Sequence, residues 1–422
     1  MNRFSAALLA ALMSCMPLAA DTWPAWRGPD HNGISPARDL PARWDADTHL
    51  RWRLALPGPA PSTPAIWGER IFLTSADGEA LLLMAVATDG TELWRIPAGD
   101  GNRDIRQGES NAAAPSPVTD GEHVWAFFGT GVLLCATADG SEIWRTDLQD
   151  RYGEFRMYWG MATSPLLKDG RLYLQLMHDN AQLLLALDAA TGEEVWTHRR
   201  QTDARDENLH SYASLIPFAM DGETYLIAHG ADYVTAHRID GGEEVWRSGG
   251  LQDPGNYNSY LRFVATPVTA PGLIVVPSAK NGPVLGIDPE GARGDITHSG
   301  DQFHWKLSNS TTDVPSPLIH EGLVYILREN GVLLCLDAKT GELVYQESVY
   351  RRRHRASPVY ADGKLYLTAM DGTVNVVKAG RDYAMLATNK FEEHTAASPA
   401  IADGVIYFRT EKALYAIGGE TE

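Results

Sequence analysis

The stretch Leu183-Leu184-Leu185-Ala186-Leu187-Asp188-Ala189-Ala190-Thr191-Gly192-Glu193-Glu194-Val195-Trp196 decides the fold of this chain. A short apolar run leads into a turn at Thr191-Gly192, and a second run follows that ends on tryptophan. Runs of this length, divided by a glycine-containing turn, predict two antiparallel strands. Nearly the same phrase returns at residues 333–345, where Tyr345 takes the place of the tryptophan. An internal repeat therefore organises the sequence.

A Ser/Thr-Pro pair marks the start of each repeat. Most of these pairs lie 41 to 53 residues apart, and the one longer gap, between Pro165 and Pro267, holds a further unit that begins at Ser214-Leu215 without its proline. The chain therefore contains eight units. The seven complete pairs are Thr63-Pro64, Ser116-Pro117, Ser164-Pro165, Thr266-Pro267, Ser316-Pro317, Ser357-Pro358 and Ser398-Pro399.

Each unit predicts four short strands. Asp-Gly occurs eleven times, mostly between short apolar runs, and no window shows a sustained helical period. Four meandering strands per unit are typical of a propeller blade. The predicted fold is all-β, an eight-bladed β-propeller of four-stranded antiparallel blades. Trp94, Trp144, Trp196 and Trp246 each follow the last turn of a unit, and we expect these rings to fill the gaps between neighbouring blades.

The last unit runs out at Ile417 without an outer strand, while residues 51–56, which include Trp52, precede the first unit. This N-terminal strand is predicted to complete the last blade and close the ring, because closure removes an exposed sheet edge. The predicted organisation is a signal peptide at 1–20, an N-terminal arm at 21–50, the propeller at 51–418 and a tail at 419–422. The arm either anchors to the propeller through Trp23, Trp26 and Trp44 or caps the channel mouth with Arg27.

The first twenty residues resemble an export signal. One charge at Arg3 precedes an apolar run that is too short to span a bilayer, and small residues lead to Ala20. Leu12-Met13-Ser14-Cys15 also resembles a lipobox, so two forms stay open: cleavage after Ala20, or a lipid anchor at Cys15. Either form predicts a periplasmic or secreted protein, membrane-anchored in the second case, and no transmembrane helix is expected.

Charge and motif content exclude several classes of function. A net charge of −18 argues against nucleic-acid binding, which needs a basic surface. Cys135 and Cys335 lie in non-adjacent units, so neither a disulfide nor a zinc site is expected. The sequence contains no P-loop, no metalloprotease motif and no Gly-x-Ser-x-Gly. No catalytic residue and no metal ligand is therefore predicted.

The repeat resembles the pyrroloquinoline-quinone (PQQ)-type propeller repeat, most clearly at residues 183–196 and 333–345. Carriers of this repeat include the quinoprotein alcohol dehydrogenases and BamB, the propeller lipoprotein of the outer-membrane β-barrel assembly machine. The opening Trp23-Pro24-Ala25-Trp26-Arg27-Gly28-Pro29 is also similar to secreted PQQ-binding-like repeat proteins. The quinoprotein enzymes carry an adjacent Cys-Cys disulfide and a calcium-holding acidic set, and this chain has no matching motif. The resemblance therefore implies the fold but not the cofactor: no cofactor is expected, and PQQ with calcium stays an alternative that no motif in the sequence supports.

The connectors that lead into each Ser/Thr-Pro pair share one face of the predicted propeller. Residues three to six places before each pair should therefore surround the channel mouth, where the connectors of units two to five are long and aromatic. We expect Arg262 and Arg353, four places before their pairs, to face one opening together with His210 and His394. The predicted ligand-binding residues are Asn111, Tyr158, Trp159, His210, Tyr260, Arg262, Asp313, Arg353, His354, Glu393 and His394.

Two classes of function follow from these features. The first is a non-catalytic scaffold outside the cytoplasm that binds a protein segment, an envelope component or an anionic ligand on the connector face. The second is an enzyme, either a quinone-dependent dehydrogenase or a hydrolase or lyase of acidic carbohydrates. The run Arg351-Arg352-Arg353-His354-Arg355 is either a solvated loop or a seat for a carboxylate or another anion, which arginine binds bidentately. The absence of catalytic motifs favours the scaffold.

Overall fold

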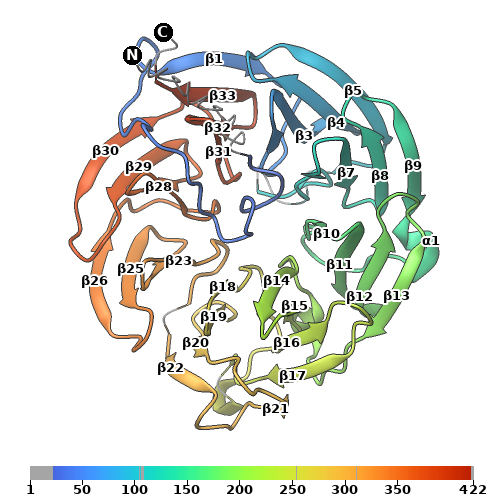
Figure 1. Cartoon of the computed structure of the whole chain (residues 1–422), viewed down its shortest axis with the longest axis vertical. Helices are drawn as coiled ribbons and strands as arrows, with labels where there is room; N and C mark the ends of the chain where they lie inside the picture. Colours follow the sequence, from blue (N-terminus) through green and yellow to red (C-terminus); the bar gives the residue numbers. More distant parts are fainter. Residues whose placement is uncertain (1–21, 104, 106–108, 253, 310, 420–422) are drawn as a thin grey trace, which may run out of the picture.

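The computed structural model describes residues 22–103, 105, 109–252, 254–309 and 311–419. The predicted signal peptide, Cys15 and most of the predicted tail lie outside these residues. The described part of the chain folds into eight sheets arranged around a central channel, and the four blade strands of each sheet pair antiparallel (Figure 1). The predicted eight-bladed, all-β propeller is therefore confirmed. Its few helical turns are α1 (Leu148–Tyr152), η1 (Asp206–Leu209) and η2 (Pro254–Asn256).

In the first four blades the strands follow one another from the channel outward. Their bounds are β2 (Ala65–Trp67), β3 (Arg70–Asp77), β4 (Ala80–Ala87) and β5 (Glu92–Gly99); β6 (Val118–Thr119), β7 (His123–Phe127), β8 (Val132–Thr137) and β9 (Glu142–Asp147); β10 (Leu166–Lys168), β11 (Arg171–His178), β12 (Ala181–Asp188) and β13 (Glu194–Arg199); β14 (Ile216–Met220), β15 (Glu223–Gly230), β16 (Tyr233–Arg238) and β17 (Glu244–Ser248). The fourth of these blades follows Ser214-Leu215, so the unit predicted there, which lacks the proline, is confirmed.

The remaining four blades repeat this order, except that the last takes its outer strand from the N-terminal part of the chain. Their bounds are β18 (Val268–Ala270), β19 (Leu273–Pro277), β20 (Val284–Ile287) and β22 (Phe303–Leu307); β23 (Leu318–His320), β24 (Leu323–Leu327), β25 (Val332–Asp337) and β26 (Leu343–Ser348); β27 (Val359–Ala361), β28 (Lys364–Thr368), β29 (Thr373–Lys378) and β30 (Met385–Lys390); β31 (Ala400–Ala402), β32 (Val405–Arg409), β33 (Ala413–Gly418) and β1 (Leu50–Ala55).

The ring is closed by β1, as predicted. It pairs antiparallel with β33, with Trp52 opposite Ala416 and Ala55 opposite Ala413. Figure 1 shows the blue β1 beside the red β33. The closing pair joins the two ends of the described chain, so the final blade forms only when residues far apart in the sequence meet. With β1 the last blade has four antiparallel strands, like the other blades of the described chain.

The strand-opening Ser and Thr residues tie neighbouring blades together at the channel wall. The backbone N–H of each of these residues donates to the side-chain hydroxyl of the equivalent residue in the next blade. The series begins with Thr63 donating to Ser116 at 2.9 Å and ends with Ser357 donating to Ser398 at 2.9 Å. The Thr63 hydroxyl closes the circle by donating to the Ser398 carbonyl at 3.1 Å. This circle explains why each unit opens with a hydroxyl residue, including Ser214, which has no proline after it.

The outer-strand tryptophans dock onto the following blade, as predicted for Trp196. Its indole N–H donates to the Ile239 carbonyl at 3.2 Å, and its ring covers Gly242. At Gly242, φ is +78° and an added Cβ would lie 2.7 Å from the ring, so the turn needs glycine for both conformation and space. Docking bonds of the same kind are made by Trp52, Trp94, Trp144 and Trp305. Apolar side chains fill the gaps between adjacent blades.

Trp246 departs from this pattern. The insert between β20 and β22 contains a short extra strand, β21 (Gly294–Asp295), which pairs parallel with β17 of the preceding blade. Ala292 and Ile296 of the insert share a cluster with Trp246, so the insert covers a ring that is only 2% exposed. The fourth blade therefore has a fifth strand that the repeat did not predict.

The N-terminal arm crosses the face opposite the connectors (Figure 1). It bonds to the far ends of the innermost strands, with Trp23 bridged to Ile66 and Ser35 donating to Tyr360. Trp44 packs against aromatic rings of the last two blades. The buried Arg27 donates to the Asn32 and Pro317 carbonyls at 2.7 and 2.6 Å. The arm thus lies against the channel end that is farthest from the connectors.

Candidate functional site

A cavity of about 170 Å³ occupies the channel below the connectors. Seven of the eight strand-opening Ser and Thr residues line it. Apart from Thr63, each of these hydroxyls accepts a backbone hydrogen bond and so keeps an O–H to donate. Trp26 of the arm closes the far end, and Trp159 and Tyr212 form part of the wall. The cavity therefore opens towards the connector face.

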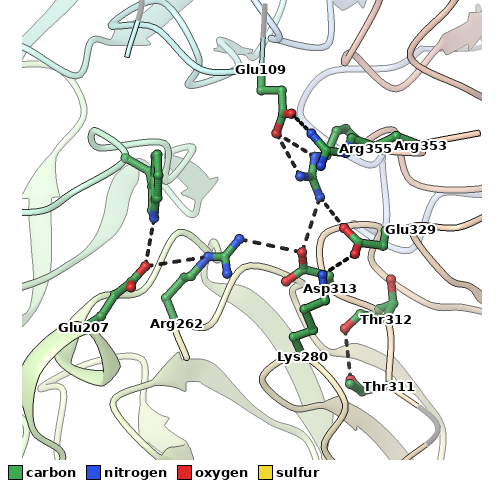
Figure 2. A network of polar contacts seen from close by, with 11 residues as sticks. Glu109, Glu207, Arg262, Lys280, Thr311, Thr312, Asp313, Glu329, Arg353 and Arg355 are labelled. Atoms are coloured by element: carbon green, nitrogen blue, oxygen red, sulfur yellow. Dashed lines mark hydrogen bonds and ion pairs between the residues drawn. The ribbon is translucent and has the colours of Figure 1, made fainter. Parts of the chain in front are cut away.

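The rim of this cavity carries a network of charged side chains, shown in Figure 2. Arg355 is at its centre, with a side chain only 6% exposed. Its guanidinium contacts Glu109 at 2.8 Å, Glu329 at 3.1 Å and Asp313 at 3.4 Å. Fork-shaped arginine suits such multiple contacts.

Three more cations complete the network. Arg262 lies 3.6 Å from Asp313 and 3.8 Å from Glu207, Lys280 pairs with Glu329, and Arg353 pairs with Glu109. The four cations are balanced by the four carboxylates, so this set of side chains is formally neutral. Its members come from the connectors and turns of several blades, and it ties these loops together around the opening.

The two carboxyl groups nearest the centre differ in pKa. Burial raises the pKa of Asp313, helped by the neighbouring Glu329 and opposed by Arg262 and Arg355. Burial acts in the same direction on Glu329, but hydrogen bonds with Lys280 and Asp313 and the charges of Lys280 and Arg355 lower its pKa to about 2. The network therefore shifts the pKa values of these two neighbouring carboxyl groups in opposite directions, downward for Glu329 and upward for Asp313.

Replacing Glu329 with glutamine is expected to destabilise the protein near neutral pH and to matter less in acid. A carboxylate with a lowered native pKa contributes stability above its unfolded value, and this contribution fades between about pH 4.5 and pH 2. Chemical denaturation of Glu329→Gln and the parent across this range measures the difference. Glu321→Gln, on the exposed Glu321 of the same blade, is the matched control. A difference that grows on acidification would contradict the assignment.

The predicted site residues fall into three groups. Arg262, Asp313 and Arg353 belong to the network, and Trp159 lines the cavity while donating its indole N–H to Glu207 at 2.8 Å. Tyr158 and Tyr260 are 59% and 63% exposed on the connector face. The remaining five make local contacts that hold connectors in place or line a neighbouring hollow: Asn111, His210, His354, Glu393 and His394.

The expectation that His210 and Arg353 face the opening with Arg262 is corrected by the structure. His210 is buried and bonds to Asp179 at 2.7 Å, while the half-exposed Arg353 lies outside the cavity lining. His394 lines the hollow beside the cavity. Side chains alternate along the extended segment 353–355: Arg353 and Arg355 both reach Glu109, whereas His354 turns into the blade.

The repeat position that faces the cavity is two residues before each strand-opening Ser or Thr, just outside the window of three to six residues predicted from the sequence. Most side chains at this position are small or apolar, and Arg355 is its only charged member. This contrast is the signal that reveals Arg355 from sequence. The eight residues are Pro61, Ala114, Ala162, Tyr212, Val264, Val314, Arg355 and Ala396.

The network does not fit a calcium–quinone pair. Calcium requires several oxygen ligands that carry negative charge, yet Glu109, Glu207, Asp313 and Glu329 are already bonded or ion-paired to other side chains. Among the described residues, no group of three His, Cys, Asp or Glu side chains is placed to hold a metal ion. Cys135 and Cys335 are buried free thiols in different blades. We therefore assign no step of chemistry to this cavity.

Comparison with known proteins gives the context of this fold. The family model described as "Outer membrane protein assembly factor BamB" matches residues 37–114, 83–299 and 294–382. The outer membrane protein assembly factor BamB of Yersinia pestis is 23% identical over 300 residues, which are 70% of this chain and 68% of that protein.

Two further relatives are dehydrogenases. The polyvinylalcohol dehydrogenase of a Pseudomonas species is 24% identical over 195 residues, which cover 42% of this chain and 28% of that enzyme. The crystal structure of quinohemoprotein alcohol dehydrogenase from Comamonas testosteroni is similar with a TM-score of 0.70 at 14% identity, covering 96% of this chain and 82% of that one. At 14% identity, the similarity to the quinohemoprotein alcohol dehydrogenase shows a shared fold and nothing more.

The helices in the described part of the chain are all too short or too polar to cross a bilayer. The family model accounts for most of the propeller, and the eight closed blades account for the repeat that it describes. The chain therefore belongs to the family of the outer membrane protein assembly factor BamB, a family of PQQ-like β-propellers.

Proposed function

We propose that this protein is a non-catalytic scaffold outside the cytoplasm, and that it binds a segment of a partner protein on its connector face. The observation that carries the proposal is the pair of exposed rings at Tyr158 and Tyr260, beside the mouth of the cavity. Exposed tyrosines are enriched where proteins recognise one another, since they bury much apolar area and keep a hydroxyl for hydrogen bonding. Family membership agrees with a role in the assembly of other proteins.

The connectors that present these tyrosines are held against each other. Asn208 donates its backbone N–H to the Ser259 carbonyl at 3.1 Å, and the Ser259 hydroxyl donates to Asp206 at 2.6 Å. The Tyr158 ring packs edge-on against His210 with ring centres 5.2 Å apart. Connectors fixed in this way lose little conformational entropy when a partner binds. A prearranged surface of this kind favours binding.

The charge network supports a scaffold over an enzyme. Its carboxylates are paired with arginine and lysine, which leaves them poorly suited to act as a general acid or base. The dehydrogenase relative makes a quinone-dependent enzyme the second candidate. Incubation with PQQ and calcium, followed by a dye-linked assay with alcohols, separates the two candidates: turnover would favour the enzyme.

Site-specific crosslinking in the native host tests the scaffold. A photoreactive phenylalanine at position 158 or 260 is expected to capture the same partner protein, whereas the equally exposed position 343, on an outer strand, should not. With the purified partner, Tyr158→Ala and Tyr260→Ala should each weaken binding on the order of tenfold. Leu343→Ala should leave it unchanged. Equal capture at 343, or unchanged affinity in both tyrosine variants, would contradict the proposal.

A further inference from the structure

Two further hollows extend the cavity across the connector face. The first, about 800 Å³, shares Pro61, Glu109, Ser110 and Ala396 with the cavity. The second, about 750 Å³, meets the first at Arg353. Because neighbouring hollows share lining residues, they lie in a row from the channel mouth to the edge of the sixth blade, and we call this row the groove. We call the outer hollow, lined by Glu329, Asn330, Val332, Gln346, Ser348 and Arg351 to Arg353, the arginine hollow.

The arginine hollow has an excess of positive charge. Arg351 and Arg352 are exposed, and their side chains donate to the Ser348 hydroxyl and the Arg351 carbonyl at 3.3 and 3.4 Å. Within the described residues, neither has a carboxylate within ion-pairing distance. Arg353 is half exposed and pairs with Glu109. The acid in the lining, Glu329, is neutralised by Lys280 and Arg355.

The rest of the groove is closer to balance. The lining of the middle hollow includes two arginines, Arg353 and Arg409, and two acids, Glu109 and Glu411. Arg409 is buried and bonds to hydroxyls and carbonyls of the first blade, at 2.9 Å from Ser62, rather than to an acid. The positive charge of the groove is therefore concentrated at its outer end.

We propose that the arginine hollow binds an acidic stretch of the partner segment, whose flanking residues follow the groove towards the cavity. This inference rests on the proposed scaffold function and adds the chemistry of the partner. Paired arginine forks bind carboxylates bidentately, and Asn330, Gln346 and Ser348 supply further hydrogen-bond donors. The positive charges of three successive arginines also repel one another, and a bound anion reduces this repulsion.

The composition of the groove favours a polypeptide over an acidic polysaccharide. The described residues that line its two outer hollows include no tryptophan, tyrosine or phenylalanine ring on which a sugar could stack. Arginine, in contrast, is enriched at interfaces between proteins. Binding of an acidic segment here must be local, because the chain as a whole carries a net charge of −18 and repels polyanions.

The test uses the whole protein and a fluorescein-labelled peptide of eight glutamates. Fluorescence anisotropy is expected to show binding that weakens as salt rises, and no binding of the matching glutamine peptide. The double variant Arg351→Gln/Arg352→Gln should bind the acidic peptide on the order of tenfold more weakly. The control Arg156→Gln/Arg381→Gln, with the same change of charge at two exposed arginines, should bind within about twofold of the parent.

Each outcome decides a separate point. Equal losses in both double variants would overturn the inference, because the effect would then be one of overall charge. Tighter arginine-dependent binding of an alginate oligomer than of the peptide would overturn it in favour of a polysaccharide. If positions 158 and 260 capture no partner while peptide binding depends on Arg351 and Arg352, the scaffold proposal is refuted and the acidic ligand is not. Intact crosslinking with no peptide binding would refute only the acidic stretch.

Discussion

A truncated protein that begins at Gly58 is expected to aggregate, whereas one that begins at Ala46 should remain soluble. The shorter form lacks β1, so β33 loses its outer partner and becomes the exposed edge of a blade with only three strands. It also loses the indole bond from Trp52 to Thr88, at 2.8 Å, which joins the last blade to the first. An open array with a free edge pairs readily with other copies. Light scattering after purification measures the result.

The form that begins at Ala46 is the matched control. It keeps β1 but lacks most of the arm, including Trp23 and Trp44, which pack in the same core cluster. We expect a lower unfolding temperature for this form and a monomeric peak in size-exclusion chromatography. If the Gly58 form is soluble and melts like the Ala46 form, ring closure by β1 does not stabilise the propeller.

Replacing Trp305 with alanine is expected to lower the free energy of unfolding by about 3–5 kcal/mol, because the change removes a large buried ring and leaves a cavity. Trp305 is 7% exposed, and its indole N–H donates to the Ala338 carbonyl of the next blade at 2.9 Å. Its ring also covers Gly341 in that blade, where an added Cβ would lie 2.6 Å away. Urea denaturation followed by circular dichroism measures the loss.

Trp159→Ala is the control for this experiment. Trp159 is half-buried and lies on a connector rather than on an outer strand, and its indole N–H donates to Glu207 of another connector. We expect its replacement to cost on the order of 1 kcal/mol. Equal destabilisation by the two substitutions would show that the outer-strand tryptophans do not carry the contacts between blades.

The repeat by itself determines the eight blades. Hairpin turns, alternating runs and strand-opening hydroxyls are local features, and each blade forms mainly from contacts within its own unit. The unit at Ser214 could be predicted from this repeat although its proline is missing. The closing strand at 51–56 could be predicted because the last unit lacks an outer strand of its own. The docking of Trp196 onto Gly242 also follows from the period, since equivalent residues in successive blades meet equivalent neighbours.

The arrangement of the candidate site was decided by the tertiary structure. Arg353 and Arg355 lie on the same side of their extended connector, but only Arg355, which is two residues closer to the innermost strand, lines the cavity. Glu109, Glu207, Lys280 and Glu329 join the network from loops whose sequences share no motif. The extra strand β21 likewise depends on a contact with the preceding blade. Strands are specified by local periodicity, whereas a network between connectors is specified only by which loops the closed ring brings together.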